Sequence, residues 1–200
     1  MSKEKKPGII RRAWRWFRTP SRLAIGTLLG LGFIAGIVFV SGFNTSMTMM
    51  NSEEFCISCH EMRDNVYQEY MDTVHYSNRT GVRAVCSDCH VPHEFVPKMV
   101  RKIKASKELY GKAMGIIDTP QKFDEHRLQM AKNEWERMKG NNSQECRNCH
   151  NFDFMDFTEQ KGVAAKMHSL AIKENKTCID CHKGIAHKLP DMTGIDTGFN

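Results

Sequence analysis

Long apolar runs are scarce in this 200-residue chain, and apart from one segment near its start the sequence is only moderately hydrophobic. A domain of this size is held together mainly by the apolar surface that it buries. The sequence therefore predicts a thin side-chain core. Some other source of apolar bulk is needed if the chain is to fold stably.

A basic excess is also absent from most of the chain, although the whole chain has a formal net charge of +6. Residues 1–22 carry eight basic residues and one acidic residue, which gives +7. The remaining 21 basic and 22 acidic residues give −1 for residues 23–200. Nucleic-acid binding needs a basic surface on the binding domain, so this distribution argues against nucleic acid and favours redox proteins as partners.

No cysteine lies outside one five-residue pattern, Cys-x-x-Cys-His, which occurs four times. A disulfide framework would show varied spacings, and a zinc site would pair cysteines in fours without a His directly after each pair. The pattern instead suits covalent haem, because two thiols bind the two vinyl groups while the next His binds the iron. The four copies are Cys56/Cys59/His60, Cys86/Cys89/His90, Cys146/Cys149/His150 and Cys178/Cys181/His182.

These motifs predict a tetrahaem c-type cytochrome. Four covalently attached porphyrins would supply the apolar bulk that the side chains lack, so we expect a mainly α-helical haem domain and a largely unfolded apo-protein.

Residues 23–43, LAIGTLLGLGFIAGIVFVSGF, are the exception to the scarcity of apolar runs. These 21 residues carry no charge, and at ~1.5 Å per residue a helix of this length crosses a ~30 Å hydrocarbon core. Gly26, Gly30, Gly32 and Gly36 include small-x-x-x-small spacings that suit a partner helix, so homo-oligomerisation stays open. We predict one transmembrane helix in the lipid bilayer.

The residues before this helix predict its orientation. Positive charge is retained in the cytoplasm, so residues 1–22 are expected on the cytoplasmic side and the haem domain on the other. The apolar segment is longer than a usual signal-peptide core and no clear cleavage site follows, which favours an uncleaved signal anchor. The charged residues are Lys3, Glu4, Lys5, Lys6, Arg11, Arg12, Arg15, Arg18 and Arg22.

An internal repeat organises the haem domain, residues 44–190. The first two motifs begin 30 residues apart and the last two 32 apart, and the halves are offset by about 90. This spacing predicts a duplicated dihaem unit with halves at about 52–112 and 141–190. A charged helix through Lys139 is expected to form a spacer between the halves, and residues 191–200 a flexible tail.

Histidines outside the motifs follow the same repeat. His75 and His168 lie 11 and 10 residues before the second and fourth motifs, and His187 follows the fourth. Because a low-spin haem takes a second strong axial ligand, we predict that these three bind iron. The duplication predicts that His75 reaches haem 3 and His187 haem 2, while His168 is left between haem 1 by symmetry and haem 4 by proximity. His93 is a weaker candidate, and His126 is expected to be solvated.

Haem 1 differs from the others in sequence. Met62 lies two residues after His60, whereas the corresponding position of the second half is Phe152. A thioether ligand raises the potential of a haem above that of a bis-imidazole haem, which suits an electron entry point. Simple packing of Met62 is the equally weighted alternative.

The anchor, the four motifs and the segments CISCHEM, CSDCHVPHEFVPKMVRKIKASKELYGK and CIDCHKGIAHKLP resemble the NapC/NirT family of membrane tetrahaem quinol dehydrogenases. The resemblance covers nearly the whole chain and is closest to members that supply periplasmic nitrate reductase. It implies oxidation of menaquinol or ubiquinol at the outer face of the bacterial inner membrane. Electrons would then pass to a periplasmic acceptor, here the cytochrome and catalytic subunits of nitrate reductase, or alternatively a nitrite or TMAO reductase.

The resemblance also implies roles for particular residues. In a related cytochrome that serves nitrite reductase, the Met of the first motif binds haem 1 in place of the motif His, which makes Met62 a ligand and leaves His60 unligated. The same relative places a Lys at the quinol and an Asp beside haem 1, and these fall on Lys102 and, across a one-residue gap, Glu108. That relative lacks a counterpart of His168 and borrows a ligand from its partner enzyme. The presence of His168 here implies complete haem ligation and an exchangeable complex.

The segment from Lys98 to Tyr110 is itself suited to quinol chemistry, as a basic helix begun after Pro97 and ended near Gly111. Lys102 would hold the head-group oxygen and Glu108 would accept a proton, if both face haem 1. The alternative is that the basic side chains simply meet anionic lipid. These side chains are Lys98, Arg101, Lys102, Lys104 and Lys107.

Two other functions are disfavoured. A terminal multihaem reductase needs a haem with an open distal site, yet spare histidines are plentiful and no motif has Lys in place of His. An assembly factor that handles haem in transit would not need four complete attachment motifs.

Overall fold

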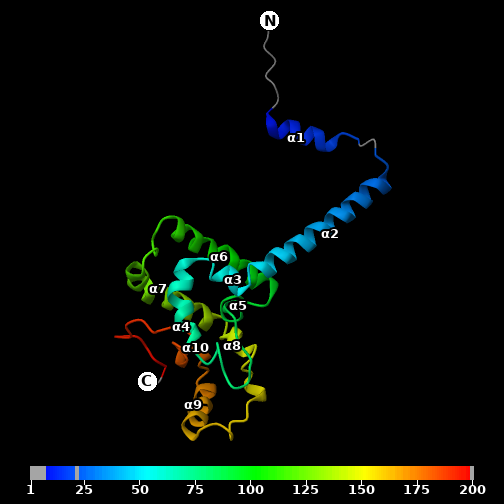
Figure 1. The fold of residues 1–200 in the computed structure, drawn as a ribbon. Helices are drawn as coiled ribbons and strands as arrows, with labels where there is room; N and C mark the ends of the chain where they lie inside the picture. The colour runs from blue at the N-terminus through cyan, green and yellow to red at the C-terminus, as the bar shows by residue number, and fades with distance from the viewer. Residues whose placement is uncertain (1–7, 21–22, 199–200) are drawn as a thin grey trace. The chain divides into compact units, whose positions relative to one another are not determined.

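The computed structural model describes residues 8–20 and 23–198, and the chain divides after Met47 into two units (Figure 1). Lys3, Glu4, Lys5, Lys6 and Arg22 of the predicted cytoplasmic segment lie outside the described residues, as do positions 199 and 200 of the tail. The described part of the chain contains helices and no strand, which confirms the mainly α-helical prediction.

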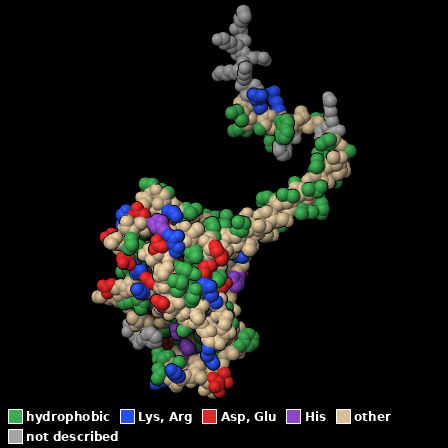
Figure 2. Space-filling view, viewed as in Figure 1, with side chains coloured by type: hydrophobic (Ala, Val, Ile, Leu, Met, Phe, Trp, Pro, Cys, Tyr) green, Lys and Arg blue, Asp and Glu red, His purple; other side chains and the backbone are tan. Residues whose placement is uncertain are grey.

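The first unit contains α1 (Ile9–Arg18) and most of α2 (Ile25–Met49). α2 has no buried residue, and its exposed apolar side chains suit a lipid environment (Figure 2). Across the described residues, α2 is the one helix long and apolar enough to cross a membrane.

α2 is longer than the predicted span of residues 23–43, because it continues for six residues beyond Phe43. The added residues are uncharged, and Ser46 satisfies its hydroxyl within the helix by donating to the Gly42 carbonyl at 2.9 Å. Ser and Thr are tolerated in this way inside an apolar helix.

The second unit is built from short helices around two long ones. The long helices are α6 (Phe95–Ala113) and α7 (Pro120–Gly140). The shorter elements are α3 (Glu53–Cys56), the π-helix η1 (Met62–Val66), α4 (Tyr67–Met71), α5 (Cys86–His90), α8 (Gln144–Arg147), the 3-10 helix η2 (Phe152–Phe154), α9 (Gly162–Lys173) and α10 (Cys178–Cys181).

The core of this unit is thin, as the sequence predicts. Within the described residues, four hydrophobic side chains are buried: Tyr70, Phe123, Met138 and Ile179. So few buried side chains cannot stabilise a unit of this size alone. The polypeptide is therefore suited to fold around an apolar group that it does not itself provide.

Each attachment motif has its first cysteine in a short helix, and in motifs 2 and 4 that cysteine begins the helix. An acid inside each of these two motifs caps α5 and α10. Asp88 accepts a hydrogen bond from the Val85 N–H at 2.8 Å, and Asp180 accepts one from the Thr177 N–H at 2.8 Å. The second cysteine of each motif is then in the same helical turn as the first, and the equivalent caps support the predicted repeat.

Motifs 1 and 3 differ from this arrangement at their second cysteines, Cys59 and Cys149. The pattern Cys-x-x-Cys-His treats the four motifs as equivalent, but α3 ends at Cys56 and α8 ends at Arg147, so both second cysteines follow the helix. The reason is the position of the two helices. Both α3 and α8 begin before their motif and end within it, and the Ser52 hydroxyl caps the start of α3. Motifs 1 and 3 share the difference, as a duplicated pair would.

The long helices agree with their predicted positions and extend beyond them. α6 begins at Phe95, two residues before Pro97, because the first turn of a helix does not need the N–H that proline lacks. It continues past Gly111 to Ala113, and Gly115 follows with φ +62°. α7 starts with Thr119 as its cap, whose hydroxyl accepts from the Lys122 N–H at 3.3 Å.

The predicted flexible tail is held at one point. The carbonyl of Gly198 accepts a hydrogen bond from Lys176 Nζ at 2.9 Å and contacts Cys181 Sγ at 3.4 Å. Residue 198 therefore lies against the fourth attachment motif.

Candidate haem and quinol sites

Three pairs of histidines face each other in the second unit, and each pair joins a motif His to one of the three predicted distal ligands. The ring centroids are 6.2 Å apart for His75 and His150 and 6.1 Å apart for His90 and His187. The third pair contains His168, which the sequence analysis did not assign to one haem.

His168 lies beside His182, with ring centroids 5.9 Å apart. This arrangement matches the sequence alternative that assigns His168 to haem 4, and it does not match the assignment to haem 1. The crossing that the duplication predicts, with His75 at motif 3 and His187 at motif 2, is the arrangement observed.

The spacing of these rings fits a haem iron between them. Metal–imidazole bonds are about 2 Å long, so two imidazoles on opposite sides of one ion have ring centroids roughly 6 Å apart. Burial lowers the pKa of His182 and of His187, which keeps these rings in the neutral form that binds metals. The Nδ1 atoms of His75 and His187 are buried and have no hydrogen-bond partner among the described residues.

The first motif has no such partner in the part of the chain described. His60 is about half exposed, at 48%, and its Nε2 atom lies 3.3 Å from Glu61 Oε1. Met62 begins the π-helical turn η1, an element that often marks functional sites. His93 and His126 do not fill the gap, because His93 contacts Asn148 at 3.3 Å and His126 contacts the Lys122 carbonyl at 2.8 Å.

The attachment points follow one another in space in their sequence order. The thiols of Cys56 and Cys86 lie close together, and this contact lowers the pKa of Cys56 and raises that of Cys86. The thiols of Cys146 and Cys178 also lie close together, and this contact lowers the pKa of Cys178. α5 packs against α8, so the second motif also adjoins the third. Four haems attached here would form a row from motif 1 to motif 4.

Among the predicted attachment cysteines, Cys149 differs from the others in its exposure to solvent. Cys149 is exposed, whereas Cys59 is half-buried like the other motif cysteines. The Cys149 N–H donates to the Cys146 carbonyl at 3.2 Å, and the Cys59 carbonyl accepts from the N–H of Met62 at 3.1 Å. Both backbones are thus fixed in turns, but the protein alone does not cover Cys149, so a porphyrin bound there would have to supply that cover.

Cys149 also marks the meeting point of the second and third motifs. Burial and the charge of Asp88 raise the pKa of the Cys89 thiol to about 11, and the nearby Cys149 adds to this rise. This proximity agrees with the packing of α5 against α8. The second and third motifs are therefore neighbours in the fold.

Lys102 and Glu108, the predicted quinol residues, are not brought together. Lys102 Nζ donates to the Met50 carbonyl at 3.0 Å and lies near Cys56 of the first motif. Burial lowers the pKa of Lys102, and the positive charge of Arg101 acts in the same direction. Glu108 instead accepts a hydrogen bond from Arg101 Nη1 at 3.0 Å, and its side chain is 66% exposed. The two positions are six residues apart in sequence, which places their side chains about 120° apart around a helix.

Glu61 is a carboxylate that the sequence reasoning did not single out. It is 3% exposed, and neither of its oxygens has a hydrogen-bond partner within the described residues. Its nearest basic side chains are His60, with Nε2 3.3 Å from Oε1, and Lys112, with Nζ 3.7 Å from Oε2. The signal that could have found it is its place between His60 and Met62 in the first motif.

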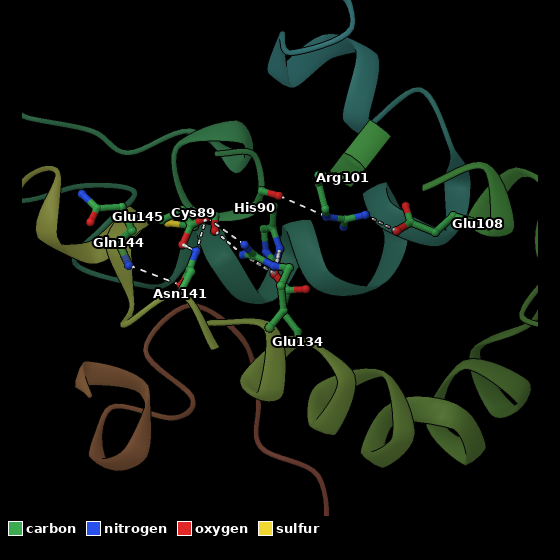
Figure 3. A network of polar contacts seen from close by, with 9 residues as sticks. Cys89, His90, Arg101, Glu108, Glu134, Asn141, Gln144 and Glu145 are labelled. Carbon is green, nitrogen blue, oxygen red and sulfur yellow. Dashed lines mark hydrogen bonds and ion pairs between the residues drawn. The ribbon is translucent and has the colours of Figure 1, made fainter. Parts of the chain in front are cut away.

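A network of ion pairs surrounds the second motif (Figure 3). Glu134 of α7 lies 2.8 Å from His90 Nδ1, and Arg137 donates to the same Glu134 oxygen from Nε at 3.0 Å and Nη2 at 2.8 Å. Burial alone would raise the pKa of Glu134, but His90 and Arg137 lower it well below its usual range. Arg137 also pairs with the buried Glu145 at 2.7 Å.

Comparison with known proteins agrees with this site. The pattern of the NapC/NirT cytochrome c family, N-terminal region, matches residues 18–192. The chain belongs to the NapC/NirT cytochrome c family. Members of a c-type cytochrome family hold haem c covalently, and with the single apolar helix α2 in its described part the chain is a single-pass inner-membrane protein.

Several curated relatives are similar over most of the chain. The cytochrome c-type protein NapC of Escherichia coli strain K12 is 73% identical over 98% of both chains. The denitrification system component NirT of Stutzerimonas stutzeri is 54% identical over 98% of this chain and 96% of its own. The cytochrome c-type protein TorC of Escherichia coli strain K12 is 44% identical over 92% of this chain and 47% of its own. No solved structure matches the chain.

Proposed function

We propose that this protein is a membrane quinol dehydrogenase that oxidises menaquinol or ubiquinol and passes the electrons through four haems c to a periplasmic reductase. The observation that carries the proposal is the set of three facing imidazole pairs beside one motif without an imidazole partner among the described residues. Three haems then have both axial positions filled, which suits electron transfer, and haem 1 is chemically distinct.

Haem 1 is the proposed entry point for electrons. Its proposed tethers are Cys56 and Cys59, and Met62 is its proposed axial ligand in place of His60, since thioether ligation raises the potential of a haem. The proposed ligands of the other haems are the motif histidine and the histidine that faces it: His90 with His187 for haem 2, His150 with His75 for haem 3, and His182 with His168 for haem 4.

The order of the attachment points supports a single path through the protein. The first and second motifs share a thiol contact, the second and third adjoin through α5 and α8, and the third and fourth share another thiol contact. Electrons that arrive at haem 1 would pass to haems 2, 3 and 4 in turn. Haem 4 is then the exit to the soluble acceptor.

The proposed quinol site lies at Lys102, whose amine is near the attachment cysteine of haem 1. Lys102 would bind a head-group oxygen, and a carboxylate would take a proton as the electrons leave. Glu108 is the acceptor that the family resemblance offers, but its pairing with Arg101 leaves the buried Glu61 as the better placed carboxylate.

The proposed location and partner follow from the anchor and the family. The basic residues before α2 support a cytoplasmic N-terminus and a periplasmic haem domain. Similarity to NapC supports periplasmic nitrate reductase as the acceptor, reached through its cytochrome subunit. Similarity to NirT and TorC supports other periplasmic reductases as the alternative.

Replacing each carboxylate separately tests the proton acceptor. Glu61→Gln is expected to slow quinol-driven haem reduction about tenfold, less than a positioned base usually contributes, because water reaches the half-exposed His60 beside it. Glu108→Gln is expected to leave the rate nearly unchanged. The haem α-band is followed in membranes after quinol addition, with dithionite-reducible haem as the reference. A larger loss in Glu108→Gln than in Glu61→Gln would return the role to Glu108.

A further inference from the structure

The ion-pair network on α7 places a carboxylate, Glu134, against the proposed haem 2 ligand His90. Glu134 is far from the second motif in sequence, yet its Oε1 atom lies 2.8 Å from Nδ1 of His90. The other ring nitrogen, Nε2, is then the one available to iron. His90 therefore carries its proton on Nδ1 and donates it in a hydrogen bond to the carboxylate.

Arg137 fixes this carboxylate in place. Its Nε and Nη2 atoms donate to Glu134 Oε1 at 3.0 and 2.8 Å, and Nη2 also donates to the Cys89 carbonyl at 3.0 Å. Its Nη1 atom donates at 2.7 Å to Glu145, which Asn141 also contacts through Nδ2. The Arg137 guanidinium thus holds Glu134 and also contacts Cys89 of the second motif and Glu145 of α8. Figure 3 shows this network.

The network leaves a net negative charge beside haem 2. Glu134 and Glu145 share Arg137, so two carboxylates face one guanidinium. Arg101, which donates to the His90 carbonyl at 3.2 Å, is itself paired with Glu108. Among these paired groups the carboxylates outnumber the guanidinium groups by one, so one negative charge is left uncompensated near the imidazole.

Haem 2 differs in this respect from the other two proposed bis-imidazole haems. His168 of the haem 4 pair has a neutral partner, because its Nδ1 atom lies 2.7 Å from the Gln160 side-chain carbonyl oxygen. His75 of the haem 3 pair has no Nδ1 partner in the described structure. Of the six paired histidines, His90 is the one whose ring nitrogen meets a carboxylate in the contacts described.

We propose that Glu134 is a positioning residue that fixes the tautomer and orientation of His90 and lowers the reduction potential of haem 2 below those of haems 3 and 4. A carboxylate partner makes the ligating imidazole more basic, and a more basic ligand stabilises Fe(III) relative to Fe(II). Haem 2 is then reduced less readily than haem 3, the next haem along the path. It acts as a relay that holds the electron briefly rather than as a store.

Potentiometric titration of the full-length protein with four haems tests this role. Glu134→Gln keeps the shape of the side chain and removes its charge, so one midpoint potential is expected to rise while three stay in place. A tenfold change in the one-electron reduction equilibrium corresponds to about 59 mV. The low-spin electron paramagnetic resonance signal of the same haem is expected to shift as well, because it reports the orientation and basicity of the axial imidazole.

Two further variants make the result decisive. Glu136→Gln removes the same charge from an exposed position of α7 and is expected to change no midpoint. Gln160→Glu places a carboxylate beside His168 and is expected to lower the potential of haem 4. Unchanged midpoints in Glu134→Gln overturn the proposal, as do equal shifts in Glu134→Gln and Glu136→Gln. If Glu134→Gln loses haem 2, an unchanged haem 4 potential in Gln160→Glu overturns it.

This inference rests on the proposed ligation of haem 2 by His90 and His187, and the two can fail separately. Loss of the ligation would show in the wild-type protein as a missing bis-imidazole signal. Failure of the Glu134 role alone would leave that signal in place and the midpoints insensitive to the charge.

Discussion

Lys102→Ala is expected to slow quinol-driven reduction of the haems by about 10- to 100-fold, with all four haems still attached. The amine of Lys102 is partly buried beside the first attachment motif, and a hydrogen bond from a charged group contributes about 1.5–3 kcal/mol. Removing it removes the proposed hold on the quinol oxygen. The measurement is the rate of α-band appearance in membranes after addition of a reduced quinone.

Lys104→Ala is the matched control for this experiment, because Lys104 is exposed on the same helix and carries the same charge. The account predicts that its rate stays near that of the wild type. Equal losses in both variants would mean that α6 acts through its general attraction to anionic lipid. Unchanged rates in both would move the quinol site away from Lys102.

His187→Ala is expected to interrupt the path after haem 1. The variant leaves haem 2 with His90 as its one protein ligand, so this haem should become high-spin. Electron delivery to a soluble acceptor should fall by more than about 100-fold, in line with the large cost of disrupting a metal ligand shell. Quinol should still reduce haem 1, which separates entry of electrons from their onward transfer.

The control is His126→Ala, since His126 is exposed and contacts the Lys122 carbonyl rather than another ring. It is expected to keep both the spectrum and the rate of the wild type. A high-spin haem in His187→Ala combined with normal delivery to the acceptor would contradict the linear path. An unchanged low-spin spectrum in His187→Ala would contradict its role as a ligand.

The parts of this structure that sequence predicts are those that local spacing controls. The 21-residue apolar run predicts α2, and the charged stretch after Pro120 predicts α7. The duplication predicts that His75 and His187 cross between halves, because one repeat supplies a ligand position to the other. Helical periodicity, applied to Lys102 and Glu108, would also have placed these two residues on different sides of α6.

The four attachment motifs have the same sequence pattern but differ in their local backbone structure. Their identical spacing does not reveal that Cys59 and Cys149 follow the ends of their helices, or that Cys149 is exposed. Those differences depend on where each helix is capped, and the cap of α3 lies outside its motif, at Ser52. A cysteine pattern therefore predicts the chemistry of attachment better than the local backbone around each thiol.

Contacts between distant segments that the internal repeat does not relate are what the sequence does not predict. The sequence left His168 between two haems because its neighbours depend on how α9 packs, and its place beside His182 favours haem 4. Glu134 reaches His90 across 44 residues, and no motif marks it. Glu61 belongs to a recognised motif, but its burial and its contact with Lys112 depend on the fold around it.

The most direct test of the central claim is a low-temperature electron paramagnetic resonance spectrum of the oxidised full-length protein, integrated against its measured haem content. The account predicts four haems per chain. Three should be low-spin bis-imidazole haems, and the fourth, haem 1, should have a different axial ligand and lose its signal in Met62→Ala. Four equivalent bis-imidazole haems, fewer than four haems, or a Met62→Ala spectrum identical to the wild type would contradict it.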